Sequence, residues 1–263
     1  MSYVETERSG AVATLTLNHP EKRNPLSGPM VAALTASFSE LRDDGDIRVI
    51  VLTGKGSAFS AGADLSELDA MQTAPMGDHV RSSYALAALF SAMRMHPKPI
   101  IARVNGHAIA GGCGLALACD FAIAADHAKV GFTEVRIGFV PAIVSALLRT
   151  SMLDRRMRDL LLTGRLVEAD EAVRLGLLSK AVDPHELDTA VEVLAETIIR
   201  ETSATAVAMT KRLLASIDGM PQANAFRFLS AHNALARATE DCREGIAAFL
   251  EKREPPWKKG ESV

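Results

Sequence analysis

Two glycine-rich segments contain the residues best suited to chemistry in this chain. The first is GKGSAFSAGADL (54–65) and the second is NGHAIAGGCGLALACD (105–120), and each follows an apolar run. Segments with so few side chains leave backbone N–H groups open toward a ligand. Two such donors directed at one point would bind a carbonyl oxygen, and more tightly once it carries negative charge. The pair therefore indicates an enzyme that stabilises an enolate.

The elements around these segments alternate between strand and helix. The alternating residues of 4–17, on both sides of Ser9-Gly10, predict a hairpin. Apolar runs predict strands over Ile47–Thr53 and Ile100–Val104, and helical spacing predicts helices over 78–94 and 112–119. Because strand, glycine turn and helix recur, we expect an α/β fold of stacked strand–strand–helix units.

From Pro141 onward the pattern is almost entirely helical. Helical spacing predicts seven helices between residues 142 and 253, and only Leu178–Val182 is expected to be extended. The composition changes near residue 200, which indicates a helical region at the C-terminus. Its last helices carry apolar stripes with Phe226 and Phe249, and such stripes fit either a core or a subunit interface.

The composition excludes several classes of protein. The net charge is −3 and the cations are spread along the 263 residues, so we expect no nucleic-acid binding. Residues 108–119 form the most membrane-like uncharged stretch, which is too short to span a bilayer, so we expect no membrane partner. Cys113, Cys119 and Cys242 have no metal-ligand spacing, and the N-terminus is not signal-like, so we expect no metal, reduced thiols and a cytoplasmic location.

Several motifs in the same order along the chain resemble the crotonase family, also called the enoyl-CoA hydratase/isomerase superfamily. Besides the two glycine-rich segments they are HPEKRNPLS (19–27), VGFTEVRIGFVP (130–141), TGRLVEADEAVRLGLLSKAV (163–182) and FLEKR (249–253). The resemblance implies a crotonase-like spiral of ββα units over residues 1–200. It also implies a helical region over 201–263 that builds a homotrimer, often paired into a hexamer. An acyl-CoA thioester is the implied ligand, and no separate cofactor is implied.

The resemblance also assigns roles to particular residues. The N–H groups of Ala63 and Gly111 fall at the positions that polarise the thioester carbonyl, and a donor of this kind typically contributes about 3 kcal/mol or more. Backbone groups around the first turn are implied to contact coenzyme A, namely at Arg23, Ala61, Ala63, Asp64 and Leu65. Phe249 and Lys252 are implied to reach the nucleotide of a neighbouring subunit, although a solvated surface charge remains open for Lys252.

One position departs from the pattern of the family's hydratases, which carry two glutamates. Glu134 in GFTEV matches the second glutamate, whereas Gly114 stands where the first is expected. One carboxylate can still take a proton from water and deliver it to C2, and it can equally move a proton between C2 and C4. The local sequence TEVRIGFVPA resembles that of enoyl-CoA and methylglutaconyl-CoA hydratases, so we favour a hydratase. An enoyl-CoA isomerase and a non-catalytic acyl-CoA-binding protein remain the alternatives.

Other groups near the motifs receive weaker roles. We interpret His107 as a buried structural histidine and Asp120 as a structural carboxylate. Arg136 either lowers the pKa of Glu134 or binds an acidic acyl group. The segments Met71–Tyr84 and Val140–Leu148 are expected to set acyl specificity.

Overall fold

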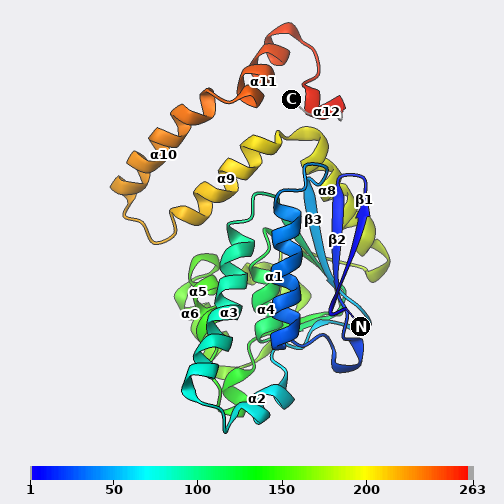
Figure 1. Ribbon diagram of the computed structural model, residues 1–263, viewed down its shortest axis with the longest axis vertical. Coiled ribbons are helices and arrows are strands. Elements are labelled where there is room, and N and C mark those ends of the chain that lie inside the picture. Colours follow the sequence, from blue (N-terminus) through cyan, green and yellow to red (C-terminus); the bar gives the residue numbers. More distant parts are fainter. Residues whose placement is uncertain (1, 260–263) are drawn as a thin grey trace.

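The computed structural model describes residues 2–259 and contains two sheets (Figure 1). The strands of the larger sheet, in spatial order, are β1 (Val4–Ser9), β2 (Val12–Leu17), β3 (Val49–Gly54), β5 (Ile100–Val104), β7 (Phe121–Ala125) and β10 (Lys180–Val182). Those of the smaller sheet are β4 (Ala58–Ser60), β6 (His107–Ile109), β8 (Lys129–Gly131) and β9 (Leu166–Glu168). Pairing is parallel except between β1 and β2 and between β8 and β9.

Helices follow and cover these strands. They are α1 (Gly28–Arg42), α2 (Leu65–Met71), α3 (Met76–Arg94), α4 (Gly111–Leu117), α5 (Ala142–Ser151), α6 (Asp154–Thr163), α7 (Ala169–Leu175), α8 (Leu187–Glu201), α9 (Ala204–Ser216), α10 (Gln222–Arg237), α11 (Glu240–Glu251) and α12 (Pro256–Lys259). Three short 3₁₀ helices are η1 (Pro20–Lys22), η2 (Glu134–Ile137) and η3 (Pro184–Glu186).

The chain passes from the larger sheet to the smaller sheet three times in the same way. β3 is followed by β4, β5 by β6 and β7 by β8, so each turn of the chain adds one strand to each sheet. Helices then follow each pair, with α2 and α3 after β4, α4 after β6, and η2 and α5 after β8. The prediction of an α/β fold built from stacked strand–strand–helix units is therefore confirmed.

Strand β3 shows how the larger sheet generates two cores. All six of its residues are buried, and successive side chains point to opposite faces of a strand. Ile50 and Leu52 pack into the main core with α1 and α3, whereas Val49 and Val51 pack with α8 on the other face. A strand that is covered on both faces is expected to carry a nearly continuous apolar run, as Val49 to Leu52 do here.

The C-terminal helices α9, α10 and α11 extend beyond the sheets (Figure 1). Helix α9 is fixed to the rest of the chain by buried Lys211, whose Nζ donates to Asp120 Oδ2 at 2.6 Å and to the Lys98 carbonyl at 3.0 Å. Large apolar side chains of α10 and α11 are exposed, including Phe226, which is 62% exposed, and Phe249, which is 84% exposed. The division at residue 200 and the assembly into trimers stay predictions.

Most elements expected from the sequence are present. The hairpin, the strand at 100–104 and the helix ending at Arg94 are confirmed, and so are the helices after residue 141. The expectation that only Leu178–Val182 is extended in that part is wrong, because Leu166–Glu168 forms β9 and pairs antiparallel with β8. A three-residue strand is too short to show an alternating pattern, and its pairing depends on a strand more than thirty residues earlier.

Neither a membrane-spanning helix nor a metal-binding cluster occurs in the described part of the chain. Within residues 2–259, no helix has the length and apolar character needed to cross a membrane. The same part of the chain contains no group of three His, Cys, Asp or Glu side chains that could hold a metal ion.

Candidate active site

The two glycine turns are in direct backbone contact. Strands β4 and β6 are parallel neighbours, and each leads into one of the turns. Gly62 has φ +84°, and a Cβ placed on it would lie 2.7 Å from the Ile109 carbonyl oxygen and 3.1 Å from Gly111 N. A Cβ on Gly112 would lie 2.4 Å from the Ser60 carbonyl oxygen. Only glycine allows this approach, which places the Ala63 turn directly against the Gly111 turn.

The second donor follows a strained residue. Ala110 has φ 52° and ψ −122°, a region that residues with a side chain rarely adopt, and its N–H donates to the Gly131 carbonyl at 2.7 Å. Gly111 is the first residue of α4, where backbone N–H groups have no acceptor inside the helix. Within residues 2–259, neither the Gly111 nor the Ala63 N–H has an acceptor.

The first donor turn is fixed by Asn24, a residue to which the sequence analysis gave no role. Asn24 is fully buried, and its Nδ2 donates to the carbonyls of Lys55, Ala58 and Phe59 at 3.0, 2.9 and 3.2 Å. The Ser60 hydroxyl donates to the Asn24 carbonyl at 2.8 Å and accepts from Gly62 N at 3.3 Å. Asn24 has φ 54°, a backbone conformation that asparagine tolerates better than most residues. The asparagine before proline in HPEKRNP, a pair typical of turns, was the signal that the sequence offered.

A cavity of about 760 Å³ lies beside both turns. Its lining includes seven of the residues predicted for the site, namely Arg23, Ala61, Ala63, Asp64, Leu65, Gly111 and Glu134. The sequence-based prediction therefore selected residues that the fold brings together from four separate segments. Phe249 and Lys252 do not line this cavity: Phe249 lies in α11 and Lys252 is the residue that ends that helix.

Glu134 is the buried acid of the cavity. It begins η2, and the residue is only 8% exposed. Burial raises the pKa of its carboxyl above the ordinary value, and a hydrogen bond from its own backbone N–H opposes that rise. Its Oε2 is buried without a hydrogen-bond partner in the described structure. An unpaired buried oxygen is costly, which is typical of a group kept ready for a ligand.

At Gly114, where the first glutamate of the hydratase pattern is expected, neighbouring side chains occupy the space that a side chain would need. A Cβ placed on Gly114 would lie 2.5 Å from Val144 Cγ1 and 3.2 Å from Phe90 Cε2. Val144 and Phe90 are themselves nearly fully buried, so neither has free space to move into. Glycine at 114 therefore belongs to a packed arrangement behind Val144, which lines the cavity with an apolar side chain.

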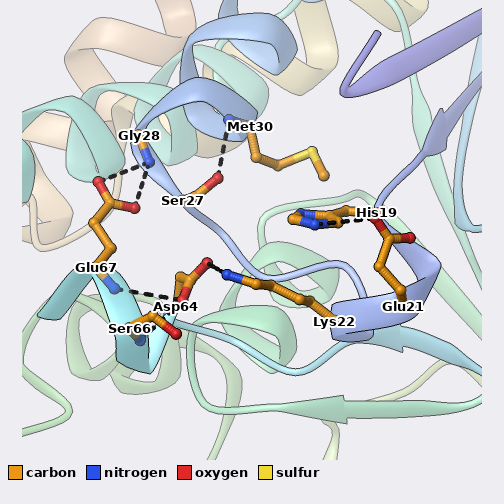
Figure 2. A network of polar contacts seen from close by, with 9 residues as sticks. All are labelled: His19, Glu21, Lys22, Ser27, Gly28, Met30, Asp64, Ser66 and Glu67. Atoms are coloured by element: carbon orange, nitrogen blue, oxygen red, sulfur yellow. Dashed lines mark hydrogen bonds and ion pairs between the residues drawn. The ribbon is translucent and has the colours of Figure 1, made fainter. Parts of the chain in front are cut away.

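Charged groups around the Ala63 turn are paired with one another or with backbone N–H groups (Figure 2). Asp64 accepts from Lys22 Nζ at 3.1 Å and caps α2 by accepting from Ser66 N at 2.9 Å. Burial acts against the charged form of Asp64, but these hydrogen bonds prevail and lower the pKa of its carboxyl. Glu67 in turn accepts from Gly28 N, the first residue of α1, at 2.9 and 3.1 Å. These contacts join the turn before α1 to α2 beside the Ala63 donor.

Three residues with weaker roles in the sequence analysis lie elsewhere. His107 is exposed rather than buried, and its Nδ1 accepts from Lys129 N at 3.0 Å. Asp120 accepts from Ile100 N at 2.7 Å and pairs with Lys211. A Cβ placed on Gly164 would lie 3.1 Å from Arg136 Cγ, so the Arg136 side chain lies over the end of α6. None of these three lines the cavity.

The segments expected to set specificity contribute unequally. Residues Val140 to Val144 line the cavity, together with Leu86 and Ser83 from α3. Met71 and Tyr84 do not, and the Tyr84 side chain is 72% exposed. Of the second segment, only the first half, Val140 to Val144, lines the cavity. Most residues of the first segment are exposed to solvent.

Comparison with known proteins gives one consistent result. A family model described as enoyl-CoA hydratase/isomerase matches residues 7–260. A Thermus thermophilus protein whose name assigns it provisionally as an enoyl-CoA hydratase is 44% identical over 96% of this chain and 99% of its own length. The (E)-benzylidenesuccinyl-CoA hydratase of Thauera aromatica is 36% identical over 97% and 98%. The crystal structure of an enoyl-CoA hydratase from Mycobacterium smegmatis superposes with a TM-score of 0.91 at 33% identity, covering 97% and 98% of the two chains.

Proposed function

Because the chain belongs to the enoyl-CoA hydratase/isomerase family, whose members act on acyl-CoA thioesters, we propose that it is a hydratase. It adds water across the C2–C3 double bond of a 2-enoyl-CoA. The observation that carries this proposal is the buried, unpartnered Oε2 of Glu134 in the same cavity as the free N–H groups of Ala63 and Gly111. Relatives named as hydratases support the choice of reaction.

The proposed mechanism uses these three residues. The N–H groups of Ala63 and Gly111 bind the thioester oxygen, and a donor of this kind contributes about 3 kcal/mol once negative charge develops there. Ionised Glu134 takes a proton from water, the water oxygen bonds to C3, and the C2–C3 electron pair moves into the thioester as an enolate. Glu134 then returns its proton to C2 and is ionised again, so one carboxylate completes the addition.

A second candidate is an isomerase that moves the double bond between C3 and C2. The observation that favours it is the filled space at Gly114, which leaves Glu134 as the buried carboxylate of the cavity. In that reaction Glu134 removes a proton from one carbon and delivers it to the other, and no water is consumed. Both reactions pass through the same enolate, so the oxyanion donors do not distinguish them.

Coenzyme A is proposed to lie along the first turn. Arg23, Ala61, Asp64 and Leu65 line the cavity there and are assigned to its adenine and pantetheine portions. We further propose a homotrimer or hexamer in which the exposed residues Phe249 and Lys252 of one subunit reach the nucleotide of the next. No cofactor beyond the coenzyme A of the substrate enters this mechanism.

A mass-resolved assay tests the proposal. Purified protein is incubated separately with a 2-enoyl-CoA and a 3-enoyl-CoA, and the products are separated by liquid chromatography, which resolves the isomers, and identified by mass spectrometry. Hydration adds the mass of one water to the 2-enoyl-CoA, whereas isomerisation of either leaves the mass unchanged. Turnover without added water would replace the hydratase by the isomerase. Rates equal to those of Glu134→Gln for both substrates would leave only a role in binding acyl-CoA.

A further inference from the structure

We infer that the substrate's acyl group is uncharged and apolar, and that the site rejects an acyl group with a second carboxylate. This inference rests on the proposed function, since it concerns the acyl part of the same site. It is carried by the side chains beyond Glu134 and by the positions of the cations around the cavity.

The cavity beyond Glu134 has an apolar wall. We define this wall by six residues from α3, η2, the segment after η2 and α5, namely Leu86, Ile137, Phe139, Val140, Ile143 and Val144. In the proposed mechanism Glu134 acts at C2 and C3, and Ile137 of the wall lies in the same 3₁₀ helix, so the wall begins beside these carbons. An acyl chain that extends past C3 therefore leaves Glu134 and runs along hydrocarbon side chains.

The cations near the cavity lie on segments other than the apolar wall. Within the described chain, Lys22 and Arg23 are the only lysine or arginine residues that line the cavity; Lys22 is the last residue of η1 and Arg23 follows it. Lys22 is paired with Asp64 at 3.1 Å. Arg136, which follows Glu134 by two residues and was a candidate partner for an acidic acyl group, lies over Gly164 and does not line the cavity. The apolar wall thus contains no cation.

A carboxylate on the acyl chain would meet two penalties in this place. In glutaconyl-CoA the second carboxyl carbon is two bonds beyond C3, so its charge falls close to the carboxylate of Glu134. Like charges at such a distance repel, and neither would gain a cationic partner. Near Val144, which is only 3% exposed, and the half-buried Leu86 and Ile143, the carboxylate would also lose water, which costs free energy unless a hydrogen-bonding or charged partner replaces it.

The test compares two substrates with the same number of carbons. Pent-2-enoyl-CoA ends in a methyl group and glutaconyl-CoA ends in a carboxylate, and kcat/KM is measured for each. We expect a ratio of at least about 100 in favour of pent-2-enoyl-CoA. A ratio within threefold of one, or a preference for glutaconyl-CoA, would overturn the inference.

A cation introduced into the wall should change the preference. Val140 is 62% exposed, so Val140→Arg has room for its side chain, and Val140→Met serves as a control of similar length without charge. We expect the kcat/KM ratio of glutaconyl-CoA to pent-2-enoyl-CoA to rise at least about tenfold in Val140→Arg relative to Val140→Met. Equal ratios in these two variants would contradict the role assigned to the wall.

Binding of unreactive thioesters separates this inference from the proposed function. The dissociation constants of pentanoyl-CoA and glutaryl-CoA for the wild-type protein are measured by calorimetry. If neither enoyl substrate is turned over but pentanoyl-CoA binds at least about 30-fold more tightly, the proposed function fails and the inference stands. Equal dissociation constants would overturn the inference whatever the turnover.

Discussion

Val144 occupies the space that any side chain at position 114 would need, since its Cγ1 would lie 2.5 Å from a Cβ on Gly114. The absence of the first glutamate of the hydratase pattern is therefore part of the core packing between α4 and α5 rather than a vacant position. Restoring the carboxylate requires that the opposing side chain also change.

The first prediction follows from that contact. Gly114→Glu overpacks the buried space between Val144 and Phe90, so we expect it to lower the free energy of unfolding by about 2 kcal/mol or more. Urea denaturation measures the change. Gly114→Glu combined with Val144→Ala, which removes the clashing Cγ1, should recover part of the loss, while Val144→Ala alone is the control. A single Gly114→Glu variant as stable as the wild type would show that this contact is not restrictive.

The second prediction concerns Glu134. Glu134→Gln removes the base at little change in volume, and we expect kcat/KM for hydration to fall by about 10³-fold. In the wild type the rate should decrease as the pH falls through the pKa of Glu134, and at a higher pH than for an ordinary glutamate, because burial raises that pKa. A pH–rate profile measures this. An unchanged rate in Glu134→Gln would remove Glu134 from the mechanism.

Although Glu134→Gln should lower the activity, we expect it to raise the stability of the folded chain. Because burial raises the pKa of Glu134 in the folded chain, the folded state binds the proton more tightly than the unfolded state does. The stability of the folded chain therefore falls as the pH rises through that pKa. Glu134→Gln should therefore have a higher Tm than the wild type at pH 7, and the difference should shrink below about pH 4. Thermal unfolding at the two pH values tests the sign.

The third prediction isolates one oxyanion donor. Gly111→Pro deletes the N–H at the first position of α4, where proline fits a helix, and we expect kcat/KM to fall by at least about 100-fold. Gly111→Ala keeps the N–H and adds a methyl group about 3.3 Å from Leu26 Cδ1, so it controls for the side chain. Circular dichroism verifies that both variants are folded. Equal losses in the two variants would mean that the N–H contributes nothing.

The fourth prediction concerns His96, which is buried between α1 and the segment after α3. Its Nε2 contacts the Phe38 carbonyl at 3.1 Å and its Nδ1 accepts from Lys98 N at 3.2 Å, an arrangement that suits the neutral ring. Burial is the main reason why the pKa of His96 is lowered to about 4.

Stability should therefore fall as the pH drops from about 6.5 toward 4, by about 3 kcal/mol from this residue alone. NMR titration of the His96 ring measures the pKa directly, and a midpoint near the ordinary value would contradict the prediction. Urea denaturation of His96→Gln should show a weaker dependence of stability on pH across this interval than the wild type.

The sequence predicted the larger sheet better than the smaller one. The strand Ile100–Val104 was expected with the correct ends, because an apolar run between a proline and a glycine turn is a strong local signal. The strands Ala58–Ser60 and Leu166–Glu168 were not expected, because three residues show no periodicity and their partners lie far along the chain.

The site shows the same limit. Ala63, Gly111 and Glu134 could be selected from motifs, and the fold places all three at one cavity. The role of Asn24 as the anchor of the first turn depends on carbonyls more than thirty residues away. The filling of the space at Gly114 depends on Val144, and no local pattern relates two residues that meet only through tertiary packing.

The backbone contact between the two glycine turns also sets what evolution can change. No side chain fits at Gly62 or Gly112, so a substitution at either position would separate the turns and is not expected to be tolerated. The wall residues Ile137 and Val140 are 61% and 62% exposed, and they can be exchanged one at a time without moving the donors. Substitutions in the wall can thus alter the surface that faces the acyl group while the two donor turns keep their backbone contact.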